Sequence, residues 1–487
     1  MPLKLYNTLT RKIEFFKPLR GNKVRIYVCG VTIYDRCHLG HARALVLFDL
    51  LYRVLKSKGY EIDFVRNFTD IDDKILNRAR EEKISWKEVA RQNLDAFRED
   101  FKDFKLSAPT VEPKATEHIP DMIQLIEQLI QKGIAYVVDG EVFFSVKMFP
   151  SYGKLSGQAL EQLRAGARIE THPKKKDPED FVLWKVRSER IPLGHEEEPS
   201  WPSPWGPGRP GWHIECSAMS LKYLGAPLDI HGGGTDLIFP HHENEIAQSE
   251  GATGKSFSRF WIHNGMVTLK EEKMSKSTGN LLRVQEILKR YSAEVVRFFL
   301  LAAHYRSPLE FNWELLDQAE KAVSRGYTAL KRLKEGLMED QLPDKIEAAT
   351  SLQEIWPRFE AALDDDLNTP VAMAVFFDAV KAIHQTFTDS RRVSRSPHRV
   401  VFEGVQNEFH RMASLLGFFE KDPNDYFQKS RLVQTSLTEK EILEQIQLRE
   451  EARKRKDWKG ADALRQQLAE KGITLEDTPK GTVWKVE

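Results

Sequence analysis

The fold is decided by a stretch that opens with Val24-Arg25-Ile26-Tyr27-Val28, in which apolar side chains alternate as in a β-strand. The strand runs into Cys29 and an irregular loop. From His38 to Leu55 apolar residues recur on one helical face, and a second strand follows at Ile62–Phe68. Strand, helix and strand within about 45 residues form a βαβ unit, which predicts a parallel sheet with a right-handed crossover. Ligands gather at the carboxyl ends of such strands, where Cys29 and Thr69 lie.

Length and composition are typical of a multidomain cytosolic enzyme. The chain has 487 residues, and 73 Lys and Arg against 72 Asp and Glu leave a net charge of +1. At roughly 150 residues per domain we expect about three to four domains. The net charge excludes a uniformly basic nucleic-acid coat but allows a local basic patch. Only three cysteines occur, which favours a reducing compartment with free or metal-bound thiols.

No stretch of the sequence predicts a membrane span or a secretory signal. The longest apolar run, Val371–Phe377, is far shorter than the roughly 20 residues that a bilayer requires. The first residues lack the apolar segment of a signal peptide. We therefore expect a soluble, cytoplasmic protein, and we expect a monomer.

The rest of the chain changes pattern several times. A helix-rich stretch reaches about Lys132 and two short strands follow it. Many prolines and three tryptophans in His172–Trp212 indicate an ordered but irregular insertion. Sheet-like patterning returns before Gly232–Gly234, and the sequence is helical almost to the end after Ser292. A last module, from Thr438, reads as two helices and a small hairpin.

The helix after the first strand begins with His38-Leu39-Gly40-His41. Helix amino termini carry partial positive charge and free N–H groups, and both attract phosphate. Gly40 lets a nucleotide approach the backbone, and His38 and His41 share a helix face from which they can donate hydrogen bonds. Taken alone, the string fits two surface histidines equally well.

A second motif, Lys273-Met274-Ser275-Lys276-Ser277, combines two lysines with hydroxyl side chains. These groups suit the negative charge that develops on a triphosphate during displacement at its α-phosphorus. A solvated basic loop is the alternative. A prespecified five-residue string is rare by chance, however, and its pairing with His38–His41 favours a nucleotide site.

Two thiols, an imidazole and a carboxylate offer a tetrahedral set suited to zinc: Cys29, Cys216, His241 and Glu245. Pro240 suits a first helical position, so we expect His241 and Glu245 on one helix face. Spacing leaves His242 as an alternative to His241, and Cys37 as an alternative to Cys29. Buried thiols beside an ordinary capped helix are the reading without a metal.

The two motifs together resemble the signature pair of class I aminoacyl-tRNA synthetases. Four further stretches look specifically like the cysteinyl-tRNA synthetase family: Cys29–Asp35, Asn67–Lys74, Gly211–Ser217 and Gly232–Glu245. The resemblance spans nearly the whole chain. Its visible departure is Leu39, where isoleucine is commoner.

The resemblance implies roles for particular residues. It implies one Zn²⁺ per chain, held by Cys29, Cys216, His241 and Glu245. It implies ATP, with Mg²⁺, at His38, Gly40, His41, Lys273 and Lys276, where the two histidines and two lysines are catalytic. The candidates for holding cysteine are Gly30, Thr69, Trp212 and Asp236, with Thr69 and Asp236 on its ammonium group and Trp212 as a wall.

The reaction so implied is the ATP-dependent ligation of L-cysteine to tRNA(Cys) through a cysteinyl-adenylate. Zinc would select the substrate thiolate, because it binds a soft thiolate strongly and a protonated hydroxyl poorly. Selection at that step makes a hydrolytic editing domain unnecessary, and none stands out in the sequence.

A basic run near the carboxyl end, Arg453-Lys454-Arg455-Lys456-Asp457-Trp458-Lys459, suits phosphate contact and stacking on an unpaired base. A solvated helix face is the alternative. The resemblance makes this module the anticodon reader, with tRNA contacts expected from Arg453, Lys454, Arg455, Lys456 and Trp458.

The expected fold class is α/β, with a Rossmann-type parallel-sheet catalytic core, an insertion, an all-α helical bundle and a small carboxyl-terminal α+β module. We predict the following division: 1–115 first half of the core, 116–205 connective insertion, 206–265 second half of the core, 266–323 KMSKS and stem-contact region, 324–425 helical bundle, 426–487 anticodon-binding module.

Two other functions fit parts of this pattern. A tRNA-independent cysteine ligase resembling the mycothiol-pathway enzyme shares the zinc set and both signatures, but looks like the synthetase without the terminal module. A non-catalytic zinc- and RNA-binding paralogue is the other, and the intact signatures argue against it.

Overall fold

The computed structural model describes residues 2–157, 173–186, 198–269, 272–273, 282–344, 355–433, 439–478 and 481–486. The chain forms two compact units. The first contains Met1–Val284, Leu300–Phe311 and Glu360–Ala372, and the second contains Gln285–Phe299, Asn312–Phe359 and Met373–Glu487. Within the described ranges, none of the helices has both the length and the apolar character needed to cross a bilayer.

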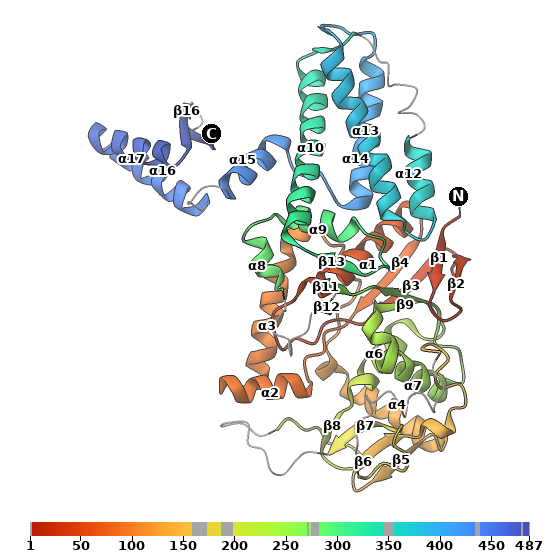
Figure 1. The fold of residues 1–487 in the computed structure, drawn as a ribbon. Helices are drawn as coiled ribbons and strands as arrows, with labels where there is room; N and C mark the ends of the chain where they lie inside the picture. The colour runs from red at the N-terminus through yellow and green to blue at the C-terminus, as the bar shows by residue number, and fades with distance from the viewer. Residues whose placement is uncertain are drawn as a thin grey trace. The chain divides into compact units, whose positions relative to one another are not determined.

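The core of the first unit is a four-stranded parallel sheet (Figure 1). Its strands, in spatial order, are β10 (Ser258–Asn264), β9 (Leu228–Gly234), β3 (Lys23–Val28) and β4 (Glu61–Arg66). All three pairings are parallel. The helix α1 (Leu39–Ser57) joins β3 to β4, which confirms the predicted βαβ unit. Five of the six residues of β3 are buried, as expected for a central strand covered on both faces.

Helices and a small hairpin surround this sheet. They are β1 (Lys4–Asn7), β2 (Lys12–Phe15), α2 (Asp73–Glu82), α3 (Trp86–Phe101), α4 (Ile119–Gln131), α6 (Trp212–Leu224) and α7 (Glu243–Thr253). The Asp72 side chain accepts from the Lys74 N–H and caps α2. The predicted second strand is two residues too long, because the chain leaves the sheet after Arg66. Asn67 and Thr69 therefore lie beyond the strand end, towards the site.

A four-stranded antiparallel sheet lies between α4 and α6 in the chain, and its last strand falls just beyond the boundary predicted at residue 205. Its strands are β5 (Ala135–Val138), β6 (Glu141–Phe144), β7 (Phe181–Val186) and β8 (Gly208–Pro210). The expectation of an irregular segment over His172–Trp212 is therefore wrong for β7 and β8. Prolines on both sides obscure a strand whose Leu183 and Trp184 are fully buried.

A small three-stranded sheet follows the core. It consists of β11 (Val267–Leu269), β12 (Glu272–Lys273) and β13 (Leu309–Phe311), with β11 in the middle. The strand β11 continues from β10 through Gly265 and Met266. It therefore connects the parallel sheet directly to the strand that contains Lys273.

Helices dominate the remaining chain, as the sequence predicts. The bounds are α8 (Val284–Leu288), α9 (Ala293–Leu301), α10 (Trp313–Met338), α12 (Ile355–Asp364), α13 (Thr369–Asp389), α14 (Arg399–Leu416) and α15 (Pro423–Val433), with short paired strands β14 (Leu342–Pro343) and β15 (Arg392–Val393). Within the second unit, Glu294 of α9 accepts from the Tyr327 hydroxyl and from the Phe419 N–H.

The last module has the predicted order of two helices and a hairpin. These are α16 (Glu439–Lys454), α17 (Trp458–Glu470), β16 (Ile473–Thr478) and β17 (Gly481–Val486). They enclose an apolar core of Ile442, Ile446, Leu468, Ile473, Leu475 and Trp484. This core shows that the module packs around its own apolar centre.

Candidate active site and metal centre

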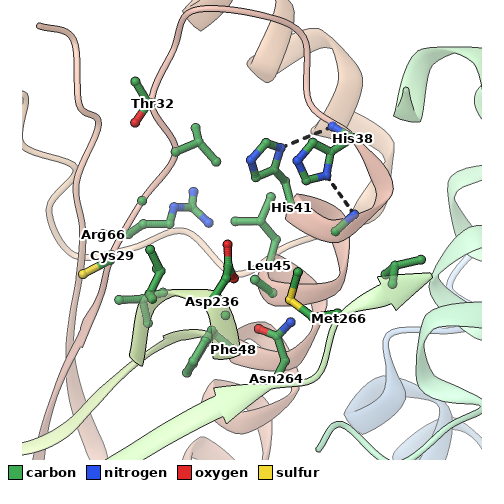
Figure 2. Close-up of a pocket in the computed structure, with 18 of the residues that line it drawn as sticks. Cys29, Thr32, His38, His41, Leu45, Phe48, Arg66, Asp236, Asn264 and Met266 are labelled. Carbon is green, nitrogen blue, oxygen red and sulfur yellow. Dashed lines mark hydrogen bonds between the residues drawn. The ribbon is translucent and has the colours of Figure 1, made fainter. Parts of the chain in front are cut away.

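A cavity of about 260 Å³ lies at the carboxyl ends of β3, β9 and β10 (Figure 2). Its wall includes residues from each of these ends and from the starts of α1 and α6, among them Gly30, His41, Trp212, Asp236 and Met266. This is where an open parallel sheet gathers its ligands. The cavity thus lies at the edge of the sheet where the βαβ unit led us to expect a site.

The two histidines of the first motif form a reciprocal cap at the start of α1. The Gly40 N–H donates to His38 Nδ1 at 3.1 Å, and the His38 N–H donates to His41 Nδ1 at 3.2 Å. Each Nδ1 therefore accepts, so in the neutral ring the hydrogen lies on Nε2. Both Nε2 atoms remain as hydrogen-bond donors, and both rings line the cavity.

These histidines are neutral at pH 7. Burial lowers the pKa of His38 to about 4 and lowers the pKa of His41 well below its usual value. The rings stack with centroids 3.7 Å apart, so a second positive charge would meet the first at close range. They can donate to phosphate oxygens without carrying a charge.

Gly40 is fixed by the cap. A Cβ atom at this position would lie 2.9 Å from His38 Cε1 and 3.0 Å from Nδ1. Any larger residue therefore displaces the ring that forms the cap.

The second motif is only partly described. Residues 274–281, which include Lys276, lie outside the described ranges, and only the backbone of Lys273 is described, in β12. The residues that follow the undescribed segment are hydrogen-bonded to the backbone around the first motif. The Leu39 N–H donates to the Leu282 carbonyl at 3.0 Å, and the Val284 N–H donates to the Cys37 carbonyl at 2.9 Å. The residues that follow the lysine motif thus pair with the backbone at the start of α1.

Among the residues that the structure describes, two groups of side chains have metal-ligating atoms within 4.8 Å of one another. One is Cys29, Cys216, His241 and Glu245, and the other is Cys29, His231, His242 and Glu245. Cys29 Sγ lies 3.1 Å from Glu245 Oε1, and His241 Nε2 lies 3.1 Å from the same oxygen. Cys29 follows β3 and His231 lies in the middle of β9, while the other four side chains lie on α6, on α7 and in the π-helix Ile238–His242 before it. Cys37 belongs to neither group.

The first group is the better fit to zinc. Two thiols, an imidazole and a carboxylate match the soft and borderline ligands that zinc prefers. Burial alone raises the pKa of the Cys216 thiol, but the neighbouring Cys29 and His241 outweigh it and bring the pKa to about 6. A thiolate is therefore available at neutral pH, as metal binding requires.

His241 and Glu245 meet at the four-residue spacing expected for one helix face, with His241 Nε2 3.1 Å from Glu245 Oε1. His241 lies in a short π-helix, Ile238–His242, that continues directly into α7 at Glu243. Within it only Phe239 has extended backbone angles, so the helical backbone resumes at Pro240, and the Phe239–Pro240 peptide bond is cis.

Further histidines lie beside these candidate metal ligands. His213 Nδ1 lies 2.9 Å from His241 Nδ1, so the predicted neighbour is in contact. His242 Nδ1 lies 2.8 Å from His263 Nε2, and His263 Nδ1 lies 2.8 Å from the Thr8 hydroxyl. His263 and Thr8 carry no motif signal, and the sequence analysis missed both.

Three of the four candidates for the cysteine pocket line the cavity, and Thr69 does not. Gly30, Trp212 and Asp236 line the cavity, and the Trp212 ring centroid lies 4.3 Å from that of His241. Thr69 is absent from the lining and instead donates to Glu215 at 3.0 Å. The Gly30 N–H donates to Asn67 Oδ1 at 2.9 Å. Asn67 thus fixes the backbone of Gly30 by a hydrogen bond without lining the cavity itself.

Several lining residues were not predicted. Arg66 precedes the family-like stretch Asn67–Lys74 and Lys74 ends it, and both bring positive charge to the cavity. Asn264 is the last residue of β10, and Met266 lies two residues beyond it. Position at a strand end was the available signal for Asn264 and Met266.

The basic run near the carboxyl end lies over the junction of α16 and α17, not on one helix. Lys456 has a left-handed backbone with φ 61°, and Asp457 caps α17. Arg453 pairs with Asp477 at 2.7 Å. Lys454, Arg455, Lys456 and Trp458 are exposed. Arg453 thus differs from the rest of the run in having an ion-pair partner within the module.

Comparison with known proteins matches the chain in three segments. Residues 15–321 match the family of class I tRNA synthetase (C) catalytic domains, residues 358–420 match the DALR domain, and residues 440–484 match the cysteinyl-tRNA ligase anticodon binding domain. The chain resembles a solved Mycobacterium tuberculosis methionyl-tRNA synthetase in complex with methionyl-adenylate, with a TM-score of 0.60 and 16% identity over 81% of this chain and 91% of that one. The fold is that of a class I aminoacyl-tRNA synthetase.

Curated relatives are much closer in sequence. A cysteine–tRNA ligase of Thermodesulfovibrio yellowstonii is 48% identical over 495 residues, covering 100% of both chains. One of Geobacter sulfurreducens is 46% identical over 499 residues, again with 100% coverage of both. The chain belongs to the cysteine–tRNA ligase family, and its activity is the ATP-dependent attachment of cysteine to tRNA. The matched anticodon-binding domain disfavours the tRNA-independent alternative.

Proposed function

We propose that the chain selects cysteine through one zinc ion held by Cys29, Cys216, His241 and Glu245. The observation that carries this proposal is the convergence of their ligand atoms within 4.8 Å in a buried site beside the cavity. A bound zinc ion supplies a soft Lewis acid that lowers a thiol pKa and accepts a thiolate far better than a hydroxyl. This chemistry separates cysteine from serine, which a pocket of matched size separates poorly.

Around that ion the chain itself orients the amino acid. Trp212 packs against His241 and forms one wall, and Asp236 offers a carboxylate for the substrate ammonium. Gly30 has no side chain and therefore leaves room in the cavity for the amino acid. Thr69 acts indirectly, since its hydroxyl is donated to Glu215.

The proposed roles in activation follow from the start of α1. His38 and His41 present neutral Nε2–H donors to the phosphate oxygens of Mg²⁺-bound ATP, while Gly40 lets the nucleotide approach the helix end. Lys273 and Lys276 stabilise the charge that develops as pyrophosphate leaves. The cysteine carboxylate attacks the α-phosphorus, one P–O bond forms and one breaks, and cysteinyl-adenylate results.

In the second step a terminal tRNA hydroxyl attacks the activated carbonyl and AMP leaves. We propose that the insertion spans 116–205, that 266–323 contacts the acceptor stem, and that 324–425 is a spacer to the anticodon module at 426–487. Lys454, Arg455, Lys456 and Trp458 contact the tRNA there, with Arg453 nearby. The enzyme acts as a cytoplasmic monomer.

Substitution of Lys276 tests the assignment. Lys276→Ala should slow cysteine-dependent ATP–pyrophosphate exchange by about 100-fold, the order expected for one transition-state contact, with the KM for cysteine nearly unchanged. Raised cysteine KM with an intact exchange rate would show that Lys276 binds the amino acid instead.

A further inference from the structure

Arg43 is a buried cation that no motif assigns. It lies two residues beyond His41 in α1, and only 2% of its surface is exposed. Its guanidinium donates four hydrogen bonds to backbone carbonyls. Nη1 donates to Gly265 at 3.0 Å and to Met266 at 2.8 Å, and Nη2 donates to His304 at 3.2 Å and to Ser307 at 2.6 Å.

These four carbonyls belong to two segments that meet beside the cavity. Gly265 and Met266 line the cavity and lead into β11. His304 and Ser307 precede β13, which pairs with β11 in parallel. The strand β11 also pairs with β12, which contains Lys273. Through these hydrogen bonds Arg43 links α1, which begins with the histidine motif, to the three-stranded sheet whose strand β12 contains Lys273.

The two segments are closely packed where they meet. The Gly265 N–H donates to the Tyr305 carbonyl at 2.8 Å, and a Cβ atom on Gly265 would lie 2.4 Å from the Ser307 carbonyl oxygen. The two segments thus lie directly against each other, and the guanidinium closes the end of their contact.

Only a guanidinium suits this cage. Burial lowers the pKa of Arg43 to about 10, so the side chain remains charged at pH 7. Among the described residues no carboxylate pairs with it, and the carbonyl oxygens alone balance the charge. A planar fork reaches four oxygens on two segments, whereas the ammonium of lysine has three donors on one atom. Loss of the guanidinium removes the donor to the Ser307 carbonyl. The carbonyls of Gly265, Met266 and His304 each keep one other donor, so the main effect of that loss is to unlink the two segments from α1.

We propose that Arg43 is a positioning residue for amino-acid activation, which sets the strand carrying Lys273 at its working distance from His38 and His41. The inference rests on the proposed roles of those residues. Substitution of Arg43 should therefore impair only the formation of cysteinyl-adenylate, the step in which the α-phosphorus of ATP reacts. Cysteine binding at the metal centre and acyl transfer from preformed adenylate do not need this distance.

Three full-length variants test it: Arg43→Ala, Arg43→Lys and Arg306→Ala. The last is a matched control, because Arg306 lies between His304 and Ser307 and pairs with Asp366 at 2.7 Å, yet its side chain takes no part in the cage. The measurements are thermal unfolding, ATP–pyrophosphate exchange, and single-turnover transfer to tRNA from isolated cysteinyl-adenylate.

Arg43→Ala should lower the exchange rate by about 100-fold, the cost of a displacement near 1 Å, with the KM for cysteine within twofold of wild type. Transfer from preformed adenylate should stay within threefold. Arg43→Lys should remain folded and show most of the same loss, and it carries the test if Arg43→Ala does not fold. Millimolar guanidinium should restore several-fold activity to Arg43→Ala but none to Arg306→Ala.

Two results would overturn the inference. One is an equal loss of exchange in Arg43→Lys and Arg306→Ala, or no loss in either. The other is a parallel loss of cysteine binding, exchange and transfer in the Arg43 variants, which would indicate general loosening. Failure of the proposed function is distinct, since it would show as absence of cysteine-dependent exchange in the wild type.

Discussion

Gly30 and the backbone carbonyl of Asn67 are packed so closely that a Cβ atom on Gly30 would lie 1.5 Å from the carbonyl oxygen and 2.7 Å from its carbon. The obstacle is backbone, which cannot rotate away. The same glycine follows Cys29 and donates its N–H to the Asn67 side chain. The first turn after β3 is thus fixed to the first turn after β4.

Gly30→Ala should therefore disturb the cysteine pocket. Because the two turns must separate, we expect kcat/KM for cysteine in exchange to fall by about 100-fold. Gly404→Ala is the matched control, since Gly404 lies inside α14 with nothing within 4 Å of the new Cβ. That change should raise the free energy of unfolding by about 0.5–1 kcal/mol and leave kcat/KM intact. Equal activity of the two variants would refute the assignment of Gly30.

The neutral cap of His38 makes stability depend on pH. The folded pKa is about 4, below the ordinary value of 6.5, because burial disfavours the charged ring. An unfolded chain takes up the proton first, so the stabilisation is complete above pH 6.5 and is lost as the pH falls towards 4.

His38→Asn should flatten this profile, because asparagine keeps a capping oxygen and does not titrate. Between about pH 6 and 4.5 the wild type should lose about 1.4 kcal/mol per pH unit more than the variant. Urea unfolding at several pH values measures the difference. Parallel profiles would mean that His38 is charged in the folded enzyme.

The exposed run at the α16–α17 junction predicts a defect limited to tRNA. Lys456→Glu with Trp458→Ala should raise the KM for tRNA in charging by about tenfold or more, since one stacked base contributes about 1–3 kcal/mol. Exchange without tRNA should be unchanged. Lys471→Glu, an equal charge change at the end of α17, is the control. If the two variants charge tRNA equally well, the run is a solvated surface.

Much of the site could be predicted because the decisive residues are close to recognisable strand ends. Alternation in Val24–Val28 fixes β3, and the end of a parallel strand fixes where Cys29 and Gly30 lie. The helix start at His38 was visible for the same reason, since capping follows local rules. These features depend on neighbours within a few residues.

Other features depend on contacts far apart in sequence. Arg43 reaches carbonyls more than 220 residues away, and nothing in its own helix predicts them. The pairing of His241 with Glu245 follows helical spacing, but the kink at Phe239 just before it has no signal in the sequence. The strand β7 was obscured by prolines outside it. Tertiary packing decides each of these cases.

On this proposal, zinc at Cys29, Cys216, His241 and Glu245 distinguishes cysteine from serine. ATP–pyrophosphate exchange with each amino acid, before and after zinc removal verified by mass spectrometry, tests it most directly. Cysteine should support exchange at least about 1,000-fold better than serine, since discrimination by ligand chemistry exceeds what pocket size achieves. Removal of zinc should abolish cysteine-dependent exchange, and added zinc should restore it. Comparable exchange with serine, or undiminished exchange by zinc-free enzyme, would show that zinc does not select the amino acid.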